Sequence, residues 1–144
     1  PAVLDADVPA PRDDVLLRAA THLAFSTPGL RELTGIANPG PALEQVAQQY
    51  AAWCCVTLGA EGVLCRDGRT PDGKSVTKRV AAFDVEAVDT LGAGDIWHGA
   101  FALALAEGAE ELEAARAASA AAAIKVTRPG GRSGAPTRAE RDRR

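Results

Sequence analysis

Residues 88–95 read Val-Asp-Thr-Leu-Gly-Ala-Gly-Asp, and they lead directly into an apolar helical pattern that we expect over residues 93–106. The first amides of a helix have no acceptor within the helix, and the helix dipole favours negative charge at this end. Because Gly92 and Gly94 have no side chains and Ala93 has only a methyl group, a phosphate can approach this backbone closely. The stretch therefore predicts an anion-binding turn, with the Asp95 carboxylate one residue inside it.

The Asp95 carboxylate gives this turn a chemical interpretation. At such a position it can accept the proton of an alcohol that attacks a γ-phosphoryl group. The alternative is an ordinary strand-to-helix turn in which Asp95 only favours the positive end of the helix. Two other phosphate-binding motifs do not fit, because a Walker loop needs Gly-Lys-Ser or Gly-Lys-Thr, and the last glycine of Gly-x-Gly-x-x-Gly is replaced by Trp97.

Short apolar runs alternate with helical patterns in the sequence before this turn. We expect strands at residues 2–4, 22–26 and 53–58, a hairpin-like pair at 63–66 and 76–80, and helices at 13–20, 27–34, 41–52, 93–106 and 112–126. This alternation predicts an α/β fold with a mostly parallel sheet that helices cover on both faces. Ligands bind beyond the carboxyl ends of such strands, and we expect the Gly-rich turn to lie at such an end.

The composition indicates one soluble globular domain, with 144 residues, 47% hydrophobic and 24% charged. A formal net charge of -3 gives no field that would attract nucleic acid or an anionic membrane. No apolar run reaches the roughly 18 residues of a membrane-spanning helix. A small-molecule ligand is therefore expected, with neither a nucleic acid nor a membrane as partner. The charged residues 138–144 have no apolar face and are predicted to form a frayed tail.

The three cysteines are expected to be buried, reduced thiols. Cys54, Cys55 and Cys65 lie in or beside apolar runs, without Cys-x-x-Cys spacing or a nearby His, so a zinc site is not expected. Reduced thiols suit a cytoplasmic protein. The sequence starts at Pro1 without the pattern of a secretion signal, and we expect a piece that starts within a domain.

The pattern Asp-Thr-x-Gly-Ala-Gly-Asp, followed by a helix of small residues, resembles the signature of the ribokinase-like (PfkB) carbohydrate kinases. Residues 56–62 resemble the family's nucleotide-loop strand, and residues 121–128 resemble its adenine-side helix. The resemblance implies that residues 1–137 are the C-terminal, nucleotide-binding half of a three-layer α/β sandwich. The N-terminal sugar-binding half and its lid, through which a homodimer could form, would then be absent.

The resemblance also implies an activity, ATP-dependent phosphorylation of a sugar hydroxyl, and the residues that carry it. Asp95 matches the base that deprotonates the sugar hydroxyl. The family's anion hole matches Gly92, Ala93 and Gly94. The positions that match nucleotide-binding residues are Thr57, Gly59, Gly62, Ala118, Ala122 and Gly131.

A first departure from the family pattern concerns magnesium. Many members carry Asn-x-x-Glu to organise Mg²⁺ around the phosphates, and this chain has Ser26 and Gly29 at those positions. We still expect Mg²⁺, held by the phosphates of the nucleotide and by other groups. Asp5 and Asp7, at the end of the first predicted strand, are candidates for binding substrate or metal-bound water, or for capping.

A second departure concerns a monovalent cation. Asp89, residues 125–128 and Gly130 lie in the region where many members hold such a cation through backbone oxygens. The family's last cation ligand is often Ser, and Gly134 falls at its place. This argues against activation by potassium, although a K⁺ site at Asp89 stays open.

Three other segments suggest a subfamily. Residues 25–30, 97–100 and 127–132 resemble the branch that contains sulfofructose kinase, with ketohexokinase-like enzymes a looser match. A ketose or ketose derivative is the acceptor that this resemblance implies. Two alternatives stay open: a nucleoside or hydroxymethylpyrimidine kinase of the same fold, and a non-catalytic nucleotide-binding module. The intact turn and its Asp95 argue against the second.

Overall fold

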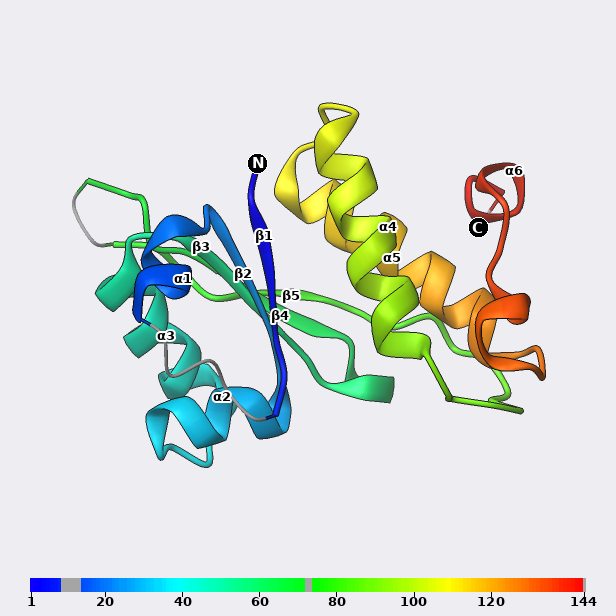
Figure 1. Ribbon diagram of the computed structural model, residues 1–144, viewed down its shortest axis with the longest axis horizontal. Coiled ribbons are helices and arrows are strands. Elements are labelled where there is room, and N and C mark those ends of the chain that lie inside the picture. Colours follow the sequence, from blue (N-terminus) through cyan, green and yellow to red (C-terminus); the bar gives the residue numbers. More distant parts are fainter. Residues whose placement is uncertain (9–13, 72–73, 144) are drawn as a thin grey trace. The chain divides into compact units, whose positions relative to one another are not determined.

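The computed structural model of the chain describes residues 1–8, 14–71 and 74–143. The chain divides into two compact units, Pro1–Val80 and Ala81–Arg144. Along the sequence, the elements are β1 (Val3–Ala6), α1 (Asp14–Ala19), β2 (His22–Ser26), α2 (Thr27–Thr34), α3 (Pro39–Tyr50), β3 (Trp53–Thr57), η1 (Gly59–Glu61), β4 (Val63–Asp67), β5 (Lys78–Val80), α4 (Ala93–Ala106), α5 (Glu111–Val126), η2 (Gly131–Gly134) and α6 (Arg138–Arg141), of which η1 and η2 are 3₁₀ turns (Figure 1).

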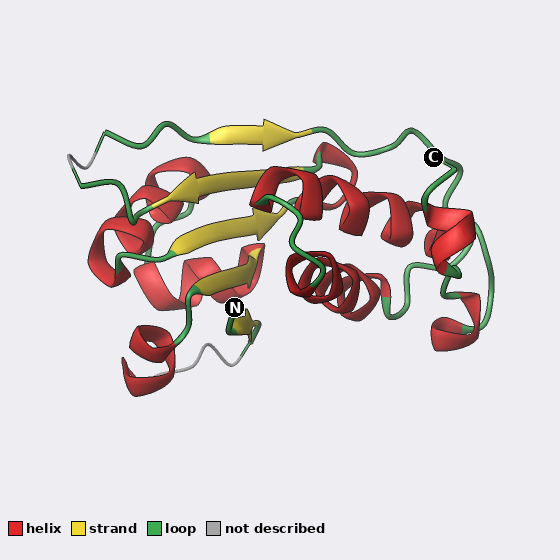
Figure 2. Ribbon diagram, turned by 90° about the horizontal axis from the view of Figure 1, so that it is seen from above, coloured by secondary structure: helices red, strands yellow, loops and turns green. Residues whose placement is uncertain are grey.

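The first unit is built on a five-stranded sheet with the strand order β1-β2-β3-β4-β5 (Figure 2). β1, β2 and β3 are parallel, and Phe25 of β2 lies opposite Val56 of β3. β3, β4 and β5 are antiparallel, with Cys55 opposite Cys65. The predicted α/β fold is confirmed, and the predicted hairpin pair forms the antiparallel edge of the sheet.

The core of this unit lies between the sheet and the helices that pack against it. Every second residue of β2 and β3 belongs to this core, including Leu23, Phe25 and Val56, which are all fully buried. Leu43 and Val46 of α3 pack into the same cluster. Because burial of an aliphatic or aromatic side chain of this size stabilises by about 1.5–3 kcal/mol, this cluster holds the helices against the sheet.

Most helices begin and end within a few residues of their predicted bounds. α2 begins where the Ser26 hydroxyl accepts a hydrogen bond from the Gly29 amide at 3.0 Å, and it ends at Gly35, whose φ is 73°. α3 begins at Pro39 rather than at the predicted residue 41, because the Asn38 side chain caps it by accepting from the Gly40 amide. Residue 13, where the first helix is predicted to begin, and residues 72–73, between the two predicted hairpin strands, lie outside the described residues.

The second unit is built on two long antiparallel helices, α4 and α5, which pack against each other (Figure 1). Trp97 of α4 stacks on Phe101 with a centroid distance of 5.0 Å, and its Nε1 donates to the Ser119 hydroxyl of α5 at 3.2 Å. The bounds of α4 are those that the sequence predicts, Ala93–Ala106.

The prediction that the Gly-rich turn follows a strand of the sheet is wrong for this structure. Residues 81–92 belong to no strand. The amides of Val88 and Asp89 instead donate to the Val126 carbonyl at the end of α5, at 2.7 and 3.1 Å. The turn is therefore positioned by a helix end and not by a strand ladder.

The prediction of a frayed tail is also wrong for residues 138–141, which form α6. Thr137 and Glu140 form a capping box at its start. Glu140 accepts from Arg128 at 2.6 Å, and Arg138 pairs with Glu107. These contacts hold a segment that lacks an apolar face.

The three cysteines are buried and free, as predicted. Burial raises the pKa of the Cys54 thiol and of the Cys65 thiol to about 12, so both stay protonated at neutral pH. Among the described residues, no helix combines the length and the apolar character that crossing a membrane requires.

Candidate active site

The Gly-rich turn at the start of α4 presents unused backbone donors. Gly92 adopts a φ of 75°, which favours glycine, and the helix begins at the next residue. Among the residues that the structure describes, the amides of Gly92, Gly94 and Asp95 have no hydrogen-bond acceptor. The Ala93 amide differs, because it donates to the Thr90 carbonyl at 3.1 Å. The predicted anion hole thus has its free donors at residues 92, 94 and 95.

The Asp95 side chain lies on the surface beside these donors. It is exposed, and its Oδ2 lies 3.9 Å from the point that a Cβ atom on Gly92 would occupy. A Cβ atom on Gly94 would meet no atom within 4 Å, so the space next to the turn is open. Asp95 also lines a cleft of about 230 Å³, together with Arg138 and Arg141. The carboxylate is thus accessible from this cleft.

Asp89 is the residue that holds the turn in this shape. Its Oδ1 accepts from the Leu91 amide at 2.9 Å, and its Oδ2 accepts from the amides of Gly130 and Gly131 at 3.1 and 3.2 Å. The Lys125 ammonium lies 3.2 Å from the same Oδ2. These bonds, led by that from Leu91, lower the pKa of Asp89 from 3.8 to about 2. The carboxylate therefore connects the turn before α4 with the loop after α5.

The lowered pKa of Asp89 predicts a loss of stability in acid. The depressed value means that the folded state favours the carboxylate, so this contribution is present above about pH 4 and is lost as the pH falls towards about 2. Asp89→Asn is expected to make the unfolding midpoint less dependent on pH in this range, measured by urea titration. Glu86→Gln, at an exposed carboxylate of the same unit, is the control. An unchanged pH dependence in Asp89→Asn contradicts the role of this carboxylate.

The region where the resemblance implies a monovalent cation already contains a cation of the protein. The Lys125 side chain is fully buried, and its Nζ donates to the carbonyls of Asp89 and Arg128 at 2.8 and 3.4 Å. These are backbone oxygens of the predicted cation region. The residues present therefore do not fit a bound potassium ion there. This role of Lys125 was not predicted, although a lysine between Ile124 and Val126 in an otherwise apolar helix end was a signal for it.

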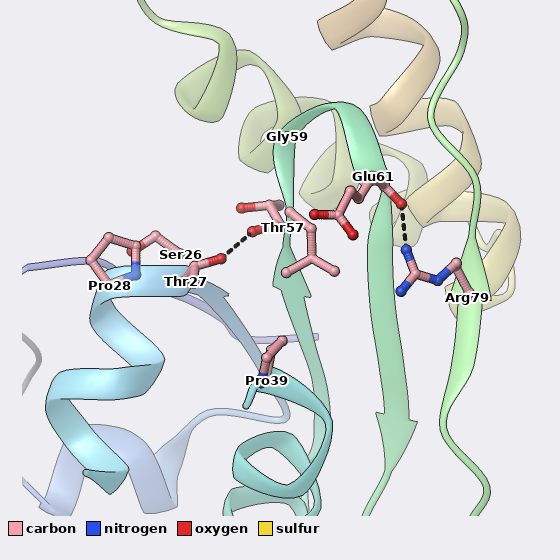
Figure 3. A pocket seen from close by; sticks show the side chains of 9 residues that line it. Ser26, Thr27, Pro28, Pro39, Thr57, Gly59, Glu61 and Arg79 are labelled. Carbon is pink, nitrogen blue, oxygen red and sulfur yellow. Dashed lines mark hydrogen bonds between the residues drawn. The ribbon is translucent and has the colours of Figure 1, made fainter. Parts of the chain in front are cut away.

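A second candidate region lies in the first unit, at the ends of β2 and β3 (Figure 3). It is a cleft of about 560 Å³, lined by Ser26, Thr27, Pro28, Pro39, Thr57, Leu58, Gly59, Glu61 and Arg79. The Thr27 hydroxyl donates to the Thr57 carbonyl at 3.0 Å, and Arg79 donates to the Glu61 carbonyl at 2.8 Å (Figure 3). Two predicted nucleotide-binding residues, Thr57 and Gly59, thus line one cleft.

The other predicted nucleotide-binding residues do not line this cleft. Gly62 closes the turn after β3 with a φ of 91°, and its carbonyl accepts from the Leu58 amide at 2.8 Å. Ala118 is fully buried in α5, and Ala122 is half-buried. Gly131 donates to Asp89, as described above. Their contacts with an adenine stay predictions. Arg79 and Glu61 line the cleft at Thr57 and Gly59 and were not predicted as site residues.

The structure explains one departure from the family's magnesium motif. A Cβ atom on Gly29 would lie 2.4 Å from the Ala6 carbonyl oxygen, so residue 29 has no room for a glutamate side chain. The Ser26 hydroxyl donates to the Asp7 carboxylate at 2.5 Å. Among the described residues, no group of three or more His, Cys, Asp and Glu side chains is arranged to hold a metal ion. These positions do not fit a protein-built magnesium site.

Comparison with known proteins agrees with the fold. The family model of the pfkB family carbohydrate kinases matches residues 2–138. The ribokinase of Bacillus subtilis is 36% identical over 92% of this chain and 43% of its own length. The chain belongs to the pfkB family of carbohydrate kinases, and it spans less than half the length of the curated relatives it matches.

Two solved structures show the same likeness. A candidate ribokinase of Agrobacterium tumefaciens has 43% sequence identity and a TM-score of 0.90, over 99% of this chain and 46% of that one. A double mutant of the Vibrio cholerae fructokinase, solved with fructose, ADP and a potassium ion, has 25% identity and a TM-score of 0.75, over 89% and 42%. The ribokinase-like fold is confirmed. The sulfofructose kinase branch has no support in these names.

Proposed function

We propose that this chain takes part in ATP-dependent phosphorylation of a sugar hydroxyl, with Asp95 as the general base. The observation that carries the proposal is the start of α4, where an exposed carboxylate lies beside the free amides of Gly92, Gly94 and Asp95. Such a group of donors, at the positive end of a 14-residue helix, favours the negative charge of a phosphoryl group. The family membership supports the same function.

The proposed reaction needs two tasks from these residues. Asp95 accepts the proton of the attacking hydroxyl, so that the oxygen bonds to the γ-phosphorus while the bond to ADP breaks. The free amides balance the charge on the transferring group. A positioned base of this kind contributes about 10²–10⁴-fold to a rate.

We assign the cleft at Thr57 and Gly59 to the nucleotide. Its polar lining, with the hydroxyl oxygens of Thr27 and Thr57 and with Arg79 on the wall, suits the polar groups of ATP (Figure 3). Mg²⁺ is expected to bind together with the phosphates of the nucleotide, and no step depends on a protein-built magnesium site.

The kinase domain is proposed to include residues 1–137. The free, buried cysteines support a reducing, cytoplasmic compartment.

Ribose is the first sugar to test, because the curated relatives that match most of this chain are ribokinases, and a ketose is the second. Purified protein carrying this chain is expected to release ADP in the presence of ATP, Mg²⁺ and one of these sugars, with the phosphorylated sugar identified by mass spectrometry. Fructose, a nucleoside and hydroxymethylpyrimidine complete the panel. Phosphorylation of only the nucleoside or hydroxymethylpyrimidine would show that the acceptor is not a sugar. No phosphorylation of any compound would favour a non-catalytic nucleotide-binding module.

A further inference from the structure

The Lys125 ammonium is enclosed by oxygens of its own chain. Its Nζ donates to the Asp89 carbonyl at 2.8 Å and to the Arg128 carbonyl at 3.4 Å, and it lies 3.2 Å from Asp89 Oδ2. An ammonium has three N–H donors, and these three oxygens can take all of them. The side chain is fully buried, and a buried charge persists only when it is paired and hydrogen-bonded.

The oxygens around this ammonium come from both sides of the candidate site. Asp89 precedes the Gly-rich turn, and Arg128 begins the loop after α5. The Asp89 carboxylate also accepts from Leu91 on the first side, and from Gly130 and Gly131 on the second. A positive charge at this point therefore holds together the two backbone segments that shape the turn.

Gly134 leaves room for the lysine stem. A Cβ atom at this residue would lie 3.5 Å from Lys125 Cδ, 3.3 Å from Arg128 Cβ and 3.4 Å from the Arg128 carbonyl oxygen. The contact with Lys125 would be an ordinary van der Waals contact, and only the one with Arg128 Cβ would be tight. Residue 134 therefore lies directly against the lysine stem.

We propose that Lys125 is a covalently attached cation that stands in place of a bound monovalent ion beneath the Gly-rich turn, and that it makes the turn independent of potassium. Potassium is held by several carbonyl oxygens that replace its water shell, and here the ammonium already uses such oxygens. The consequence for catalysis rests on the proposed function. The structural claim does not, because it concerns how residues 89–91 and 128–131 are held.

The first test compares the unaltered protein in three salts. Thermal unfolding of the protein carrying this chain is measured in potassium chloride, sodium chloride and choline chloride at equal ionic strength. The midpoint is expected to be the same in all three, since no ion has to enter the turn. A midpoint that rises in potassium alone, with saturation, would overturn the proposal. This readout needs no turnover, so it stands even if the kinase activity is not found.

The second test removes the attached cation. Lys125→Ala is expected to lower the midpoint in choline chloride by roughly 5–10 °C, because the half-buried Asp89 carboxylate and two backbone carbonyls lose the cation that they bind. Potassium is expected to restore part of this loss, and more of it in Lys125→Ala combined with Gly134→Ser, which adds a hydroxyl ligand. Lys125→Met fills the space without a charge, so its midpoint is expected to fall without recovery in potassium.

Two results of the second test would contradict the proposal. One is a midpoint of Lys125→Ala in choline equal to that of the unaltered protein, since the ammonium would then hold nothing. The other is an equal loss in all three salts, since the vacated space would then not accept a cation. If Lys125→Ala does not fold, the unfolding midpoints of the unaltered protein in the three salts still test the proposal.

Discussion

Asp95→Asn is expected to lower kcat for sugar phosphorylation by about 10²–10⁴-fold, which is the contribution of a positioned general base. The amide of Asn cannot accept the proton of the attacking hydroxyl at neutral pH, whereas the shape of the side chain is kept. Asp95 is exposed and lies in the first turn of α4, which is otherwise unchanged, so the fold should persist. The measurement is steady-state turnover with ATP and the sugar that the panel identifies.

The control for this substitution is Asp84→Asn, at an exposed carboxylate of the same unit. Its kcat should be that of the unaltered protein. ADP binding, measured by calorimetry, should be similar in both variants, because the proposed nucleotide cleft lies at Thr57 and Gly59. Near-normal turnover of Asp95→Asn would show that another group removes the proton, and lost ADP binding would show a damaged fold instead.

Gly68→Ala is expected to destabilise the first unit by about 3 kcal/mol, at the upper end of the usual cost of overpacking. A Cβ atom at Gly68 would lie 1.9 Å from the Ala47 carbonyl oxygen and 2.9 Å from the Ala52 carbonyl oxygen. The Gly68 amide donates to that same Ala52 oxygen at 2.9 Å, so the backbone cannot move away without losing this bond. Urea unfolding followed by circular dichroism measures the change.

Gly40→Ala is the matched control, because the nearest atom to its new Cβ would be Asn38 Oδ1 at 3.6 Å. Gly40 lies inside α3, where alanine is the better helix former, so this variant should be as stable as the unaltered protein or more stable. Equal stability of the two variants would mean that the end of α3 adapts to a side chain at residue 68.

The parts of the fold that the sequence predicted correctly are those set by local patterns. The small and apolar residues of α4 and the glycine before it determine its start, and the observed bounds of this helix agree with the prediction. β2 and β3 carry short apolar runs that suit a buried sheet, and both were predicted. Gly35 ends α2 because it takes a positive φ, which is also a property of the local sequence.

The parts that were missed depend on contacts between residues far apart in the chain. The tight packing of Gly68 was not predicted, because the carbonyl of Ala47 that approaches it cannot be seen in the local sequence. The helix α6 was missed because its ion pairs reach to Glu107 and Arg128. The turn before α4 lies at the predicted residues. Its hydrogen bonds to the Val126 carbonyl, however, are tertiary contacts that the local sequence does not show.

In the candidate site, too, the local features were predicted and the tertiary contacts were not. The motif located Asp95 and the glycines, because the chemistry of a helix start is local. It did not show that the Ala93 amide is used by Thr90, nor that Lys125 reaches Asp89, since each depends on the exact path of the backbone. Thr57 and Gly59 were located by resemblance, and their neighbour Arg79 comes from the middle of the edge strand β5.

The buried thiols of Cys54 and Cys65 can report how often strands β3 and β4 separate. Alkylating reagents attack the thiolate, and with a pKa near 12 and no exposed surface each thiol is almost inert while β3 and β4 stay paired. Each alkylation event at these positions therefore marks a moment when the two strands have separated, so that labelling over time measures how often the first unit opens.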